Sequence, residues 1–565
     1  MNFRKFLYFP HILIKSEKRL FLLLFFVVIL TGGGFLVRVY FQLTKPVPDT
    51  GGSYTEGILK EPRAINPIYI SNDADRDISR LIFSGLITYS AEGKIIFDLA
   101  QNYETKEDGK VYIVMLKENA FWHDGKPVTA DDVIFTIKTI QNPFYKSPLK
   151  ANWQGVTAEK VDQKTVRFTL HTPYALFIEN LTTGIIPKHL WESITPEQAP
   201  LHELNLKPVG SGPYKFNSLN QAKDGSILEY TLQRNKKYHH EGPYLNKITF
   251  LFFKTDTEMV NSWRKGKIDG FGPASKNLIP KLDQDKFKFL AARMPRIFGV
   301  FFNEKKAVIL KDKKVREALA HAINKQMLTE KLTSGGAIPT DYPLPLFASD
   351  PPKDSPLSYN PEKAKKLLTE AGWKDENNDG VLEKKSRRGK IEETTELRLQ
   401  LTTSDWPDLL QTAETIKEML KNVGVEITVK TMPFLELESN VIRPRDFEML
   451  LFGQVYGYEP DPFAFWHSSQ IKDPGLNVAM YANKDADKIM EETRKTFDLT
   501  TRRKKYEELQ KIINNDLPAV FLYSQLYLYL LPTDIKGVEI KNISLPADRF
   551  SEINNWYKKT KRVFK

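Results

Sequence analysis

The longest stretch without a charged residue lies near the start of the chain, where Leu20–Val37 is an apolar run of eighteen residues. A helix of about 20 apolar residues spans a bilayer core, whereas the apolar region of a cleaved signal peptide is usually about 7–15 residues long. No small-x-small cleavage pattern follows the run. We therefore expect an uncleaved transmembrane anchor over residues 20–43, with a cleaved signal peptide as the alternative.

The residues on either side of this run predict its orientation. A basic segment, residues 1–19, precedes the run, and a stretch containing proline and glycine, residues 44–54, follows it. Because positively charged flanks stay in the cytoplasm, the N-terminus is expected there and everything after the run outside. The prediction is a single-pass protein of the cell membrane, with residues 44–54 as a linker to an extracellular or periplasmic part.

Downstream, short runs of β-branched and aromatic residues alternate with helical patterns. Predicted strands cover residues 110–116, 165–170, 248–253 and 425–429, and predicted helices cover 314–329 and 412–422. Asn360, followed by Pro361, is a typical start of a further helix. This mixture, without regular strand–helix alternation, predicts an α/β (mixed α+β) fold.

Charge and composition exclude several classes of function. The chain of 565 residues has a net charge of +12, but half of that excess lies within residues 1–45, so the remainder is close to balanced and does not indicate nucleic-acid binding. There is no cysteine, which excludes disulfides, a thiol nucleophile and cysteine-ligated zinc.

The motifs of common catalytic and metal sites are missing as well. Neither HExxH nor GxSxG occurs, and His239-His240 sits in a polar stretch where we expect solvated or capping side chains. Residues 375–380 match the first half of a calcium loop, but the position of the usual bidentate glutamate is Ser386, so we expect a turn there and leave calcium open. We predict no catalytic residue, no metal ligand and no cofactor.

One segment has the composition of a binding site. Residues 447–466 combine an apolar run with tyrosines, tryptophan and the carboxylates of Glu459 and Asp461. Aromatic rings beside carboxylates suit a cleft for an amphipathic or cationic ligand. An aromatic corner of the core is the alternative.

The chain resembles the family 5 extracellular solute-binding proteins, the peptide- and nickel-binding components of ABC importers. The motifs that carry the resemblance occur in the order of the family: INPIY (65–69), LIFSGLITY (81–89), FWHDGKPVTADDVIF (121–135), PVGSGPYKF (208–216), YNPEKAKKLLTEAGW (359–373) and DPFAFWHS (461–468). The resemblance as a whole runs over nearly all of residues 55–530.

The resemblance implies a two-lobed periplasmic-binding-protein-like fold of the large peptide-binding type, with a hinge between the lobes. Lobe I would comprise residues 55–297, including an inserted subdomain at about 88–205. Lobe II would comprise residues 298–519, and residues 520–565 would return to lobe I and end in a basic tail.

The implied function is that of the substrate-binding protein of an ABC transporter, which captures peptides between the lobes and delivers them to membrane permease subunits. It is expected to be a monomer, to contact the lipid bilayer through residues 20–43 and to catalyse no reaction. The alternatives are a secreted carboxylate-dependent hydrolase and a binder of a metal chelate or another non-peptide solute.

The resemblance also implies where the ligand binds. Lobe I would contribute residues just before a helix, and lobe II a cleft strand with the loop after it and two aromatic walls. The residues are Ser71, Asn72, Asp73, Trp406, Phe452, Gly453, Gln454, Val455, Tyr456, Gly457, Tyr458, Glu459, Asp461 and Trp466. Peptide binders of the family often hold the ligand's α-ammonium with an aspartate where this chain has Gly457. Recognition of a free N-terminus is therefore left open, and Glu459 or Asp461 could supply the charge.

Overall fold

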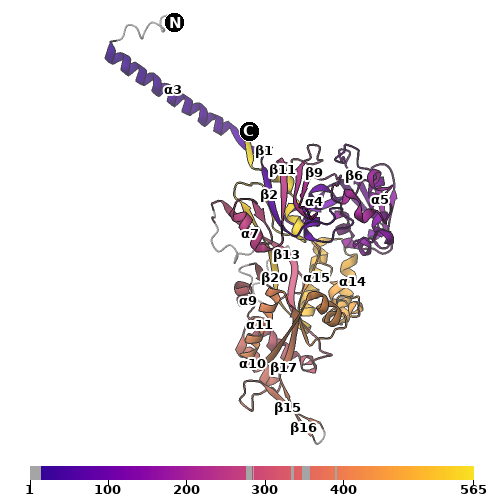
Figure 1. Ribbon diagram of the computed structural model, residues 1–565. Coiled ribbons are helices and arrows are strands. Elements are labelled where there is room, and N and C mark those ends of the chain that lie inside the picture. Colours follow the sequence, from indigo (N-terminus) through magenta and orange to yellow (C-terminus); the bar gives the residue numbers. More distant parts are fainter. Residues whose placement is uncertain (1–13, 275–282, 284, 333–335, 346–356, 389–390) are drawn as a thin grey trace.

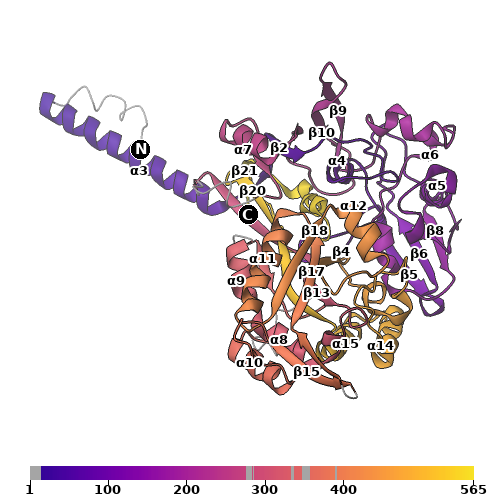
Figure 2. The same ribbon diagram turned by 60° about the horizontal axis from the view of Figure 1, so that its bottom comes forward.

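A computed structural model describes residues 14–274, 283, 285–332, 336–345, 357–388 and 391–565. The apolar run forms the helix α3 (Lys15–Leu43), which is long and apolar enough to cross a membrane. It stands clear of the rest of the molecule in both views (Figures 1 and 2), and none of its residues is buried. A helix that is apolar on all sides and has no protein partner is suited to lipid.

The remainder is a mixed α/β molecule organised around one sheet of eleven strands. The sheet runs in the order β18 (Glu426–Met432), β17 (Arg398–Ser404), β19 (Met449–Val455), β13 (Phe287–Phe302), β20 (Ala519–Pro532), β12 (Gly270–Phe271), β2 (Ser53–Leu59), β11 (Lys247–Phe253), β10 (Ile227–Arg234) and β9 (Tyr214–Gln221), and β14 (Ala337–Pro339) also pairs with β20. The composition of the strands agrees with this order, because the edge strand β9 has many polar residues and the inner strand β20 is rich in apolar ones.

The long strands β13 and β20 connect the two halves of the molecule (Figure 1). They pair antiparallel along most of their length, with a break in register between Arg293 and Ile297. Separate apolar cores lie on either side, one around Tyr230 and Trp556 and the other around Leu319 and Leu401. We keep the names lobe I and lobe II with the boundaries predicted above; both boundaries fall within or at the start of these two strands.

Lobe I carries a second, smaller sheet on its outer side (Figure 2), in the order β5 (Ala100–Lys106), β6 (Val111–Leu116), β8 (Thr165–Leu170) and β7 (Val156–Lys160). The helix α5 (Ala130–Gln141) packs on it and begins at a capping box in which the Thr129 N–H donates to Asp132. The hairpin β3 (Ile87–Tyr89) and β4 (Ile95–Phe97) lies between this sheet and the cleft.

The sequence signals for helices are mostly confirmed. Asn360 caps α10 (Pro361–Glu370) by accepting the Lys363 N–H at 2.9 Å. The helix predicted over residues 314–329 is two helices, α8 (Lys313–Ala322) and α9 (Lys325–Leu332), because the chain turns extended at Ile323. The helix predicted at 412–422 begins earlier, as α11 (Pro407–Lys421). The other helices are α4 (Asp73–Ile82), α6 (Lys188–Trp191), α7 (Asp256–Arg264), α12 (Phe434–Leu437), α13 (Phe463–Trp466), α14 (Lys484–Lys495) and α15 (Leu499–Asp516).

The expected linker is not a free segment. Residues 44–49 form β1 (Thr44–Asp49), which pairs antiparallel with β21 (Lys559–Phe564), the segment expected as a basic tail. Gly51 then donates its N–H to the Tyr244 carbonyl, so the chain enters lobe I without an open tether. The prolines at positions 46 and 48 suggested a linker, but a strand that pairs along only one edge tolerates proline, and β1 is such a strand.

Candidate ligand-binding cleft

Two cavities lie side by side, separated by a pair of tyrosines; one is lined by lobe I apart from Tyr458, and the other lies between the lobes. The loop after β19 extends Tyr458 toward lobe I, where its ring stacks on Tyr89 with centroids 4.2 Å apart. One cavity, of about 440 Å³, and the other, of about 870 Å³, share these two rings in their linings. We call them the inner and the outer cavity, respectively. Both have a volume suited to a small solute or a few residues of a peptide.

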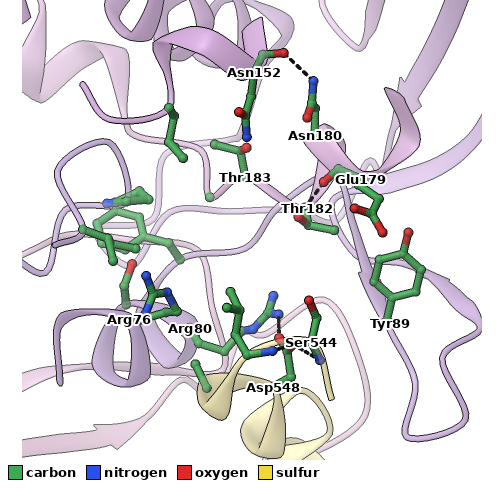
Figure 3. A pocket seen from close by; sticks show the side chains of 18 of the residues that line it. Arg76, Arg80, Tyr89, Asn152, Glu179, Asn180, Thr182, Thr183, Ser544 and Asp548 are labelled. Atoms are coloured by element: carbon green, nitrogen blue, oxygen red, sulfur yellow. Dashed lines mark hydrogen bonds and ion pairs between the residues drawn. The ribbon is translucent and has the colours of Figure 1, made fainter. Parts of the chain in front are cut away.

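The inner cavity has charged groups on facing walls (Figure 3). The helix α4 contributes Arg76 and Arg80, and the segment after β8 contributes Glu179. Arg80 forms an ion pair with Asp548, whereas Arg76 pairs with Asp73 at 2.7 Å near the surface. In Figure 3 Glu179 lies near Tyr89, across the cavity from the two arginines.

Glu179 is the acid with the most unusual environment in the cleft. Its Oε1 accepts the Glu459 N–H at 2.7 Å, and no cationic side chain pairs with it among the residues that the structure describes. Burial, together with the carboxylates of Glu459, Asp461 and Asp548, raises the pKa of Glu179 to about 7. A carboxylate held in this way gains from any cation that enters the inner cavity.

Gly457 faces this carboxylate directly. A Cβ built on Gly457 would overlap Glu179 Oε2, so no side chain fits at this position unless Glu179 moves. Gly457 therefore leaves room for the carboxylate of its neighbour in lobe I, and its own backbone conformation does not call for a glycine. The carboxylate of Glu179 occupies the space into which an aspartate at position 457 would project.

The two predicted acids of the loop are already paired within lobe II. Glu459 Oε2 lies 2.9 Å from Arg502 Nη2, and Asp461 Oδ2 lies 2.6 Å from Arg494 Nη2. The Tyr174 hydroxyl of lobe I also donates to Asp461 at 3.1 Å. Glu459 lines the outer cavity, but these arginines leave neither acid free to neutralise a ligand cation.

The cleft strand is predicted at residues 452–456, of which 452–455 form the end of β19. On one side it pairs with β13, from Phe452 with Gly299 to Val455 with Arg296. On the other side β17 pairs only with Met449 and Leu450, so residues 452–455 present an edge that no described strand covers. None of the four lines either cavity, and Val455 is 49% exposed. An uncovered edge of this kind can add an extended chain through main-chain hydrogen bonds.

Tyr456 and Trp466 do not lie on the cavity walls. Tyr456 is 4% and Trp466 0% exposed, and the Trp466 Nε1–H donates to the Tyr456 hydroxyl at 3.1 Å. Both belong to an apolar cluster of lobe II with Phe301 and Phe447. The expectation that they bind ligand does not fit this burial, since the alternative, an aromatic corner of the core, describes both residues.

The lobe I residues predicted from the family also take structural roles. Asn72 caps α4 by accepting the Asp75 N–H, the Ser71 hydroxyl donates to Asp75, and Asp73 pairs with Arg76. None of the three lines either cavity, whereas Arg76, Ser79 and Arg80 of the same helix do. Trp406 is 56% exposed and stacks on Phe434 with centroids 6.1 Å apart, away from both cavities.

Residues that sequence reasoning missed line the cleft from lobe I. Tyr89 and Glu179 are the main ones, and only Glu179 left a signal: it follows the buried run Ala175–Ile178 as a lone charge. A charged residue placed directly after such a run needs a partner or a ligand when it is buried.

Of the two roles expected for this histidine pair, solvated or capping, His239 is not solvated, because its side chain is buried. Its Nε2 lies 2.7 Å from Asp98 Oδ1, and His240 approaches the same oxygen at 3.4 Å. The three side chains could hold a metal, but Lys117 Nζ lies 3.0 Å from His240 Nε2. An ammonium group so close disfavours a second cation, so we assign this cluster a structural role.

Comparisons with known proteins agree with this architecture. The model of the bacterial extracellular solute-binding proteins, family 5 (Middle), matches residues 94–474. The oligopeptide-binding protein AppA of Bacillus subtilis is 29% identical over 519 residues, covering 90% of this chain and 92% of AppA. The dipeptide-binding protein of Escherichia coli is 25% identical, covering 84% of this chain and 90% of its own length.

Solved structures give the same result. AppA of B. subtilis in complex with a nonapeptide has a TM-score of 0.67 at 28% identity, and NikZ of Campylobacter jejuni in complex with Ni(L-His) has 0.68 at 26%; each covers 90% of this chain and 99% of the other. CtaP of Listeria monocytogenes has a TM-score of 0.74 at 26% identity, covering 90% of this chain and all of its own.

The family consists of solute-binding proteins and not of hydrolases, which decides against the hydrolase alternative. This chain belongs to the bacterial extracellular solute-binding proteins of family 5.

Proposed function

We propose that this protein captures peptides between its lobes and delivers them to the permease of an ABC importer, acting as a monomer. The observation that carries the proposal is the uncovered edge of β19 at residues 452–455, near a cleft with two cavities. Main-chain pairing along that edge would supply affinity for any extended peptide, while the cavities would accept end groups or side chains. The names of relatives such as AppA agree with a peptide ligand.

The N-terminal ammonium of the peptide would bind in the inner cavity. Glu179 offers a carboxylate with no cationic partner in the described part of the chain, at the place where Gly457 leaves room. Glu459 and Asp461 are weaker candidates because Arg502 and Arg494 already pair with them. In this proposal the anchoring charge comes from lobe I instead of from the loop of lobe II.

The ectodomain would stay attached to the cell membrane by α3, with the N-terminus in the cytoplasm. The pairing of β1 with β21 supports an uncleaved anchor, because the residues directly after the apolar run are part of a folded ribbon. Mass spectrometry of the mature N-terminus, together with extraction of membranes at high pH, tests this point. A mature chain that starts near residue 45 would exclude the anchor.

Calorimetric titration with three probes tests the peptide assignment: a free peptide, the same peptide acetylated at its N-terminus, and Ni(L-His). Peptide capture with Glu179 as anchor predicts binding of the free peptide, roughly tenfold to a hundredfold weaker binding of the acetylated form, and none of the chelate. Equal binding of both peptides would reject Glu179 as the group that binds the peptide N-terminus, but it would leave peptide capture as the function. Binding of the chelate alone would replace the peptide by a metal complex.

The length of the peptide used in the titration should match that of any peptide that co-purifies with the ectodomain. Native mass spectrometry of the protein as purified gives the mass of such a ligand directly. Fragmentation would then show whether its N-terminus is free, which the anchoring by Glu179 requires.

A further inference from the structure

The junction between α3 and the ectodomain is a two-stranded ribbon, formed by β1 and β21, which we call the basal ribbon (Figure 1). Its register runs from Thr44 opposite Phe564 to Asp49 opposite Lys559. The helix ends at Leu43 and β1 begins at the next residue, so no flexible residue separates the helix from the ribbon. The Lys565 N–H donates to the Leu43 carbonyl and closes the ribbon onto the helix end.

Arg562 fastens the ribbon to the helix. Its guanidinium donates to Thr44 Oγ1 and the Thr44 carbonyl, both at 2.8 Å, and to the Phe41 carbonyl at 3.1 Å. It also lies over the Phe41 ring, 4.3 Å from the centroid. The unpaired carbonyls at a helix C-terminus favour a cation, so this contact orients the ectodomain relative to α3.

The basal ribbon is strongly basic for its size. Its strands contain Lys45, Lys559, Lys561 and Arg562 against the single acid Asp49. Of the two other two-stranded sheets, β15 (Glu383–Arg388) with β16 (Ile391–Glu396) lies at the opposite end of the molecule (Figure 1) and has as many acids as bases, and the strands β3 and β4 have no charged residue. The excess of positive charge is therefore specific to the ribbon beside the helix, not common to exposed ribbons of this chain.

The position of the ribbon along the helix axis places it at the level of lipid headgroups. Leu20–Val37 has a length of about 27 Å as a helix, close to the hydrocarbon thickness of about 30 Å. Tyr40 and Phe41 follow in the aromatic zone that marks a membrane interface. Phe564, at the helix end of the ribbon, is 75% exposed, and its ring can enter the same zone.

We propose that the basal ribbon binds the phosphate groups of anionic phospholipids on the membrane surface and so holds the ectodomain at a fixed orientation. The proposal rests on the anchoring of α3 proposed above. Lys559, Lys561 and Lys45 would contact the phosphates, and Arg562 would keep the ribbon in register with the helix. Basic residues near an anionic surface attract it electrostatically, and the attraction weakens as salt increases.

The absence of cysteine makes a direct test possible with the full-length chain. Thr560→Cys places one label on exposed β21, and Ser386→Cys places a matched label on exposed β15 at the far end. The chain is inserted into nanodiscs of phosphatidylglycerol or phosphatidylcholine that carry a headgroup quencher. We expect strong quenching at position 560 in phosphatidylglycerol, reduced quenching in phosphatidylcholine, and none at position 386.

Charge removal supplies the second arm. Lys559→Gln with Lys561→Gln should lower quenching at position 560 in phosphatidylglycerol to its value in phosphatidylcholine, while the control pair Lys385→Gln with Arg387→Gln leaves it unchanged. Quenching that is absent, or equal in the two lipids, would overturn the proposal. A chain that does not insert into either nanodisc would instead reject the anchoring by α3, which separates the two failures.

A different observation points to a cation site in lobe II. The loop at residues 375–380 brings carboxylate oxygens of Asp375, Asp379 and Glu383 within 4.8 Å of one another. Glu383 is 7% exposed, and its Oε2 is buried without a hydrogen-bond partner among the residues that the structure describes. The Gly380 N–H donates to Asp375, and Gly380 has a positive φ of 88°, as the sharp turn of a calcium loop requires.

We infer that Ca²⁺ binds between Asp375, Asp379 and Glu383. Ser386 cannot supply the usual bidentate ligand, but Glu383, three residues earlier, is directed at the same point. A buried carboxylate oxygen without a partner is unfavourable, and a hard cation would satisfy it together with the two aspartates. Three carboxylates supply only part of the oxygen ligands that Ca²⁺ prefers, so we expect a weak site, with a Kd of roughly 10⁻⁴–10⁻³ M.

Thermal unfolding of the full chain with and without 10 mM CaCl₂, roughly ten times that Kd or more, tests the site. We expect calcium to raise the melting temperature of the parent chain and not of Glu383→Gln. Glu376→Gln, an exposed neighbour that pairs with Lys385 outside the cluster, should retain the shift. No shift in the parent chain, or an equal shift in Glu383→Gln, would overturn the site.

Discussion

Two groups of carboxylates in lobe I, one fully buried and one partly buried at the cleft, differ in whether a cation accompanies them. Glu56 and Asp77 share Arg549, whose Nη2 lies 2.8 Å from Glu56 and 2.6 Å from Asp77. The hydroxyls of Tyr54 and Tyr529 complete the group by donating to Glu56. Glu179, at the cleft, accepts one backbone N–H, and within the described ranges no basic side chain pairs with it.

The difference separates structure from binding. A buried ion pair with every lone pair satisfied has no capacity left for a ligand, so its loss harms the fold. A partly buried carboxylate without a cation destabilises the fold slightly and is stabilised when a cationic ligand arrives. The paired group therefore belongs to the core of lobe I, and the unpaired one to the binding cleft.

The largest effect is expected from removing the cation of the paired group. Arg549→Met would leave Glu56 and Asp77 buried together without their partner, and we expect the free energy of unfolding to fall by about 3–5 kcal/mol. Urea-induced unfolding followed by tryptophan fluorescence measures this. Arg398→Met, which removes an exposed arginine paired with Glu396 and Glu426, should cost less than about 1 kcal/mol. Similar losses for both variants would contradict the comparison.

Neutralising the unpaired acid should act on binding instead. Glu179→Gln keeps an acceptor for the Glu459 N–H but loses the charge, so affinity for a peptide with a free N-terminus should fall about tenfold to a hundredfold. Its stability at pH 8 should be unchanged or higher. Calorimetric titration and urea unfolding of the same samples check both.

Two further variants control this result. Glu192→Gln, an exposed acid of lobe I, should leave affinity unchanged. Glu179→Ala combined with Gly457→Asp moves the carboxylate to lobe II and should recover part of the affinity that Glu179→Ala loses. A double variant no better than Glu179→Ala would show that the position of the charge, as we propose it, is wrong.

The pH dependence of stability and affinity should have opposite signs at Glu179. Its pKa in the folded protein is about 7 and the usual value is 4.5, so the folded state holds the proton more tightly between these values. Stability contributed by this group therefore falls as pH rises from 4.5 to 7. Affinity for a cationic ligand rises over the same range, because binding requires the ionised carboxylate. Glu179→Gln should remove the pH dependence of both quantities. If stability and affinity of the parent chain changed with pH in the same direction, Glu179 would not be the group responsible.

The smallest effect is expected at the neighbouring glycine. In Gly457→Ala the new methyl group displaces the end of the Glu179 side chain, which is flexible, so affinity should fall by only about 1 kcal/mol, roughly fivefold. The same substitution in the Glu179→Ala background should have no effect, because the overlap is gone. Titration of the four chains forms a double-mutant cycle, and additive losses would argue against contact between the two positions.

Local signals predicted the elements whose partners are near in sequence. The start of α10 at Asn360 and Pro361, and the strands at 165–170 and 248–253, follow from capping and β-branched composition. The division of residues 314–329 into α8 and α9 was missed, because a continuous helical pattern does not reveal where packing makes the chain extended.

Contacts between distant residues explain the errors at the site. The hydrogen bond between Glu459 and Glu179 spans 280 residues, and that between Arg562 and Thr44 spans 518. The family pattern indicated Tyr456 as part of the cleft strand and Trp466 as a wall of the cleft, but their rings fill the core of lobe II. Burial of a ring depends on what packs against it, and a motif does not contain that information.

The sequence by itself determined the apolar helix, the mixed α/β character and the membership of a solute-binding family, since composition, periodicity and motif order are properties of the chain alone. Only the tertiary structure decided which carboxylate is left without a cation and that the supposed linker is a paired ribbon. Both outcomes depend on groups far apart in sequence that come within a few ångströms. Whether a carboxylate is paired with a cation, and whether a strand edge is hydrogen-bonded, is decided by those neighbours in space.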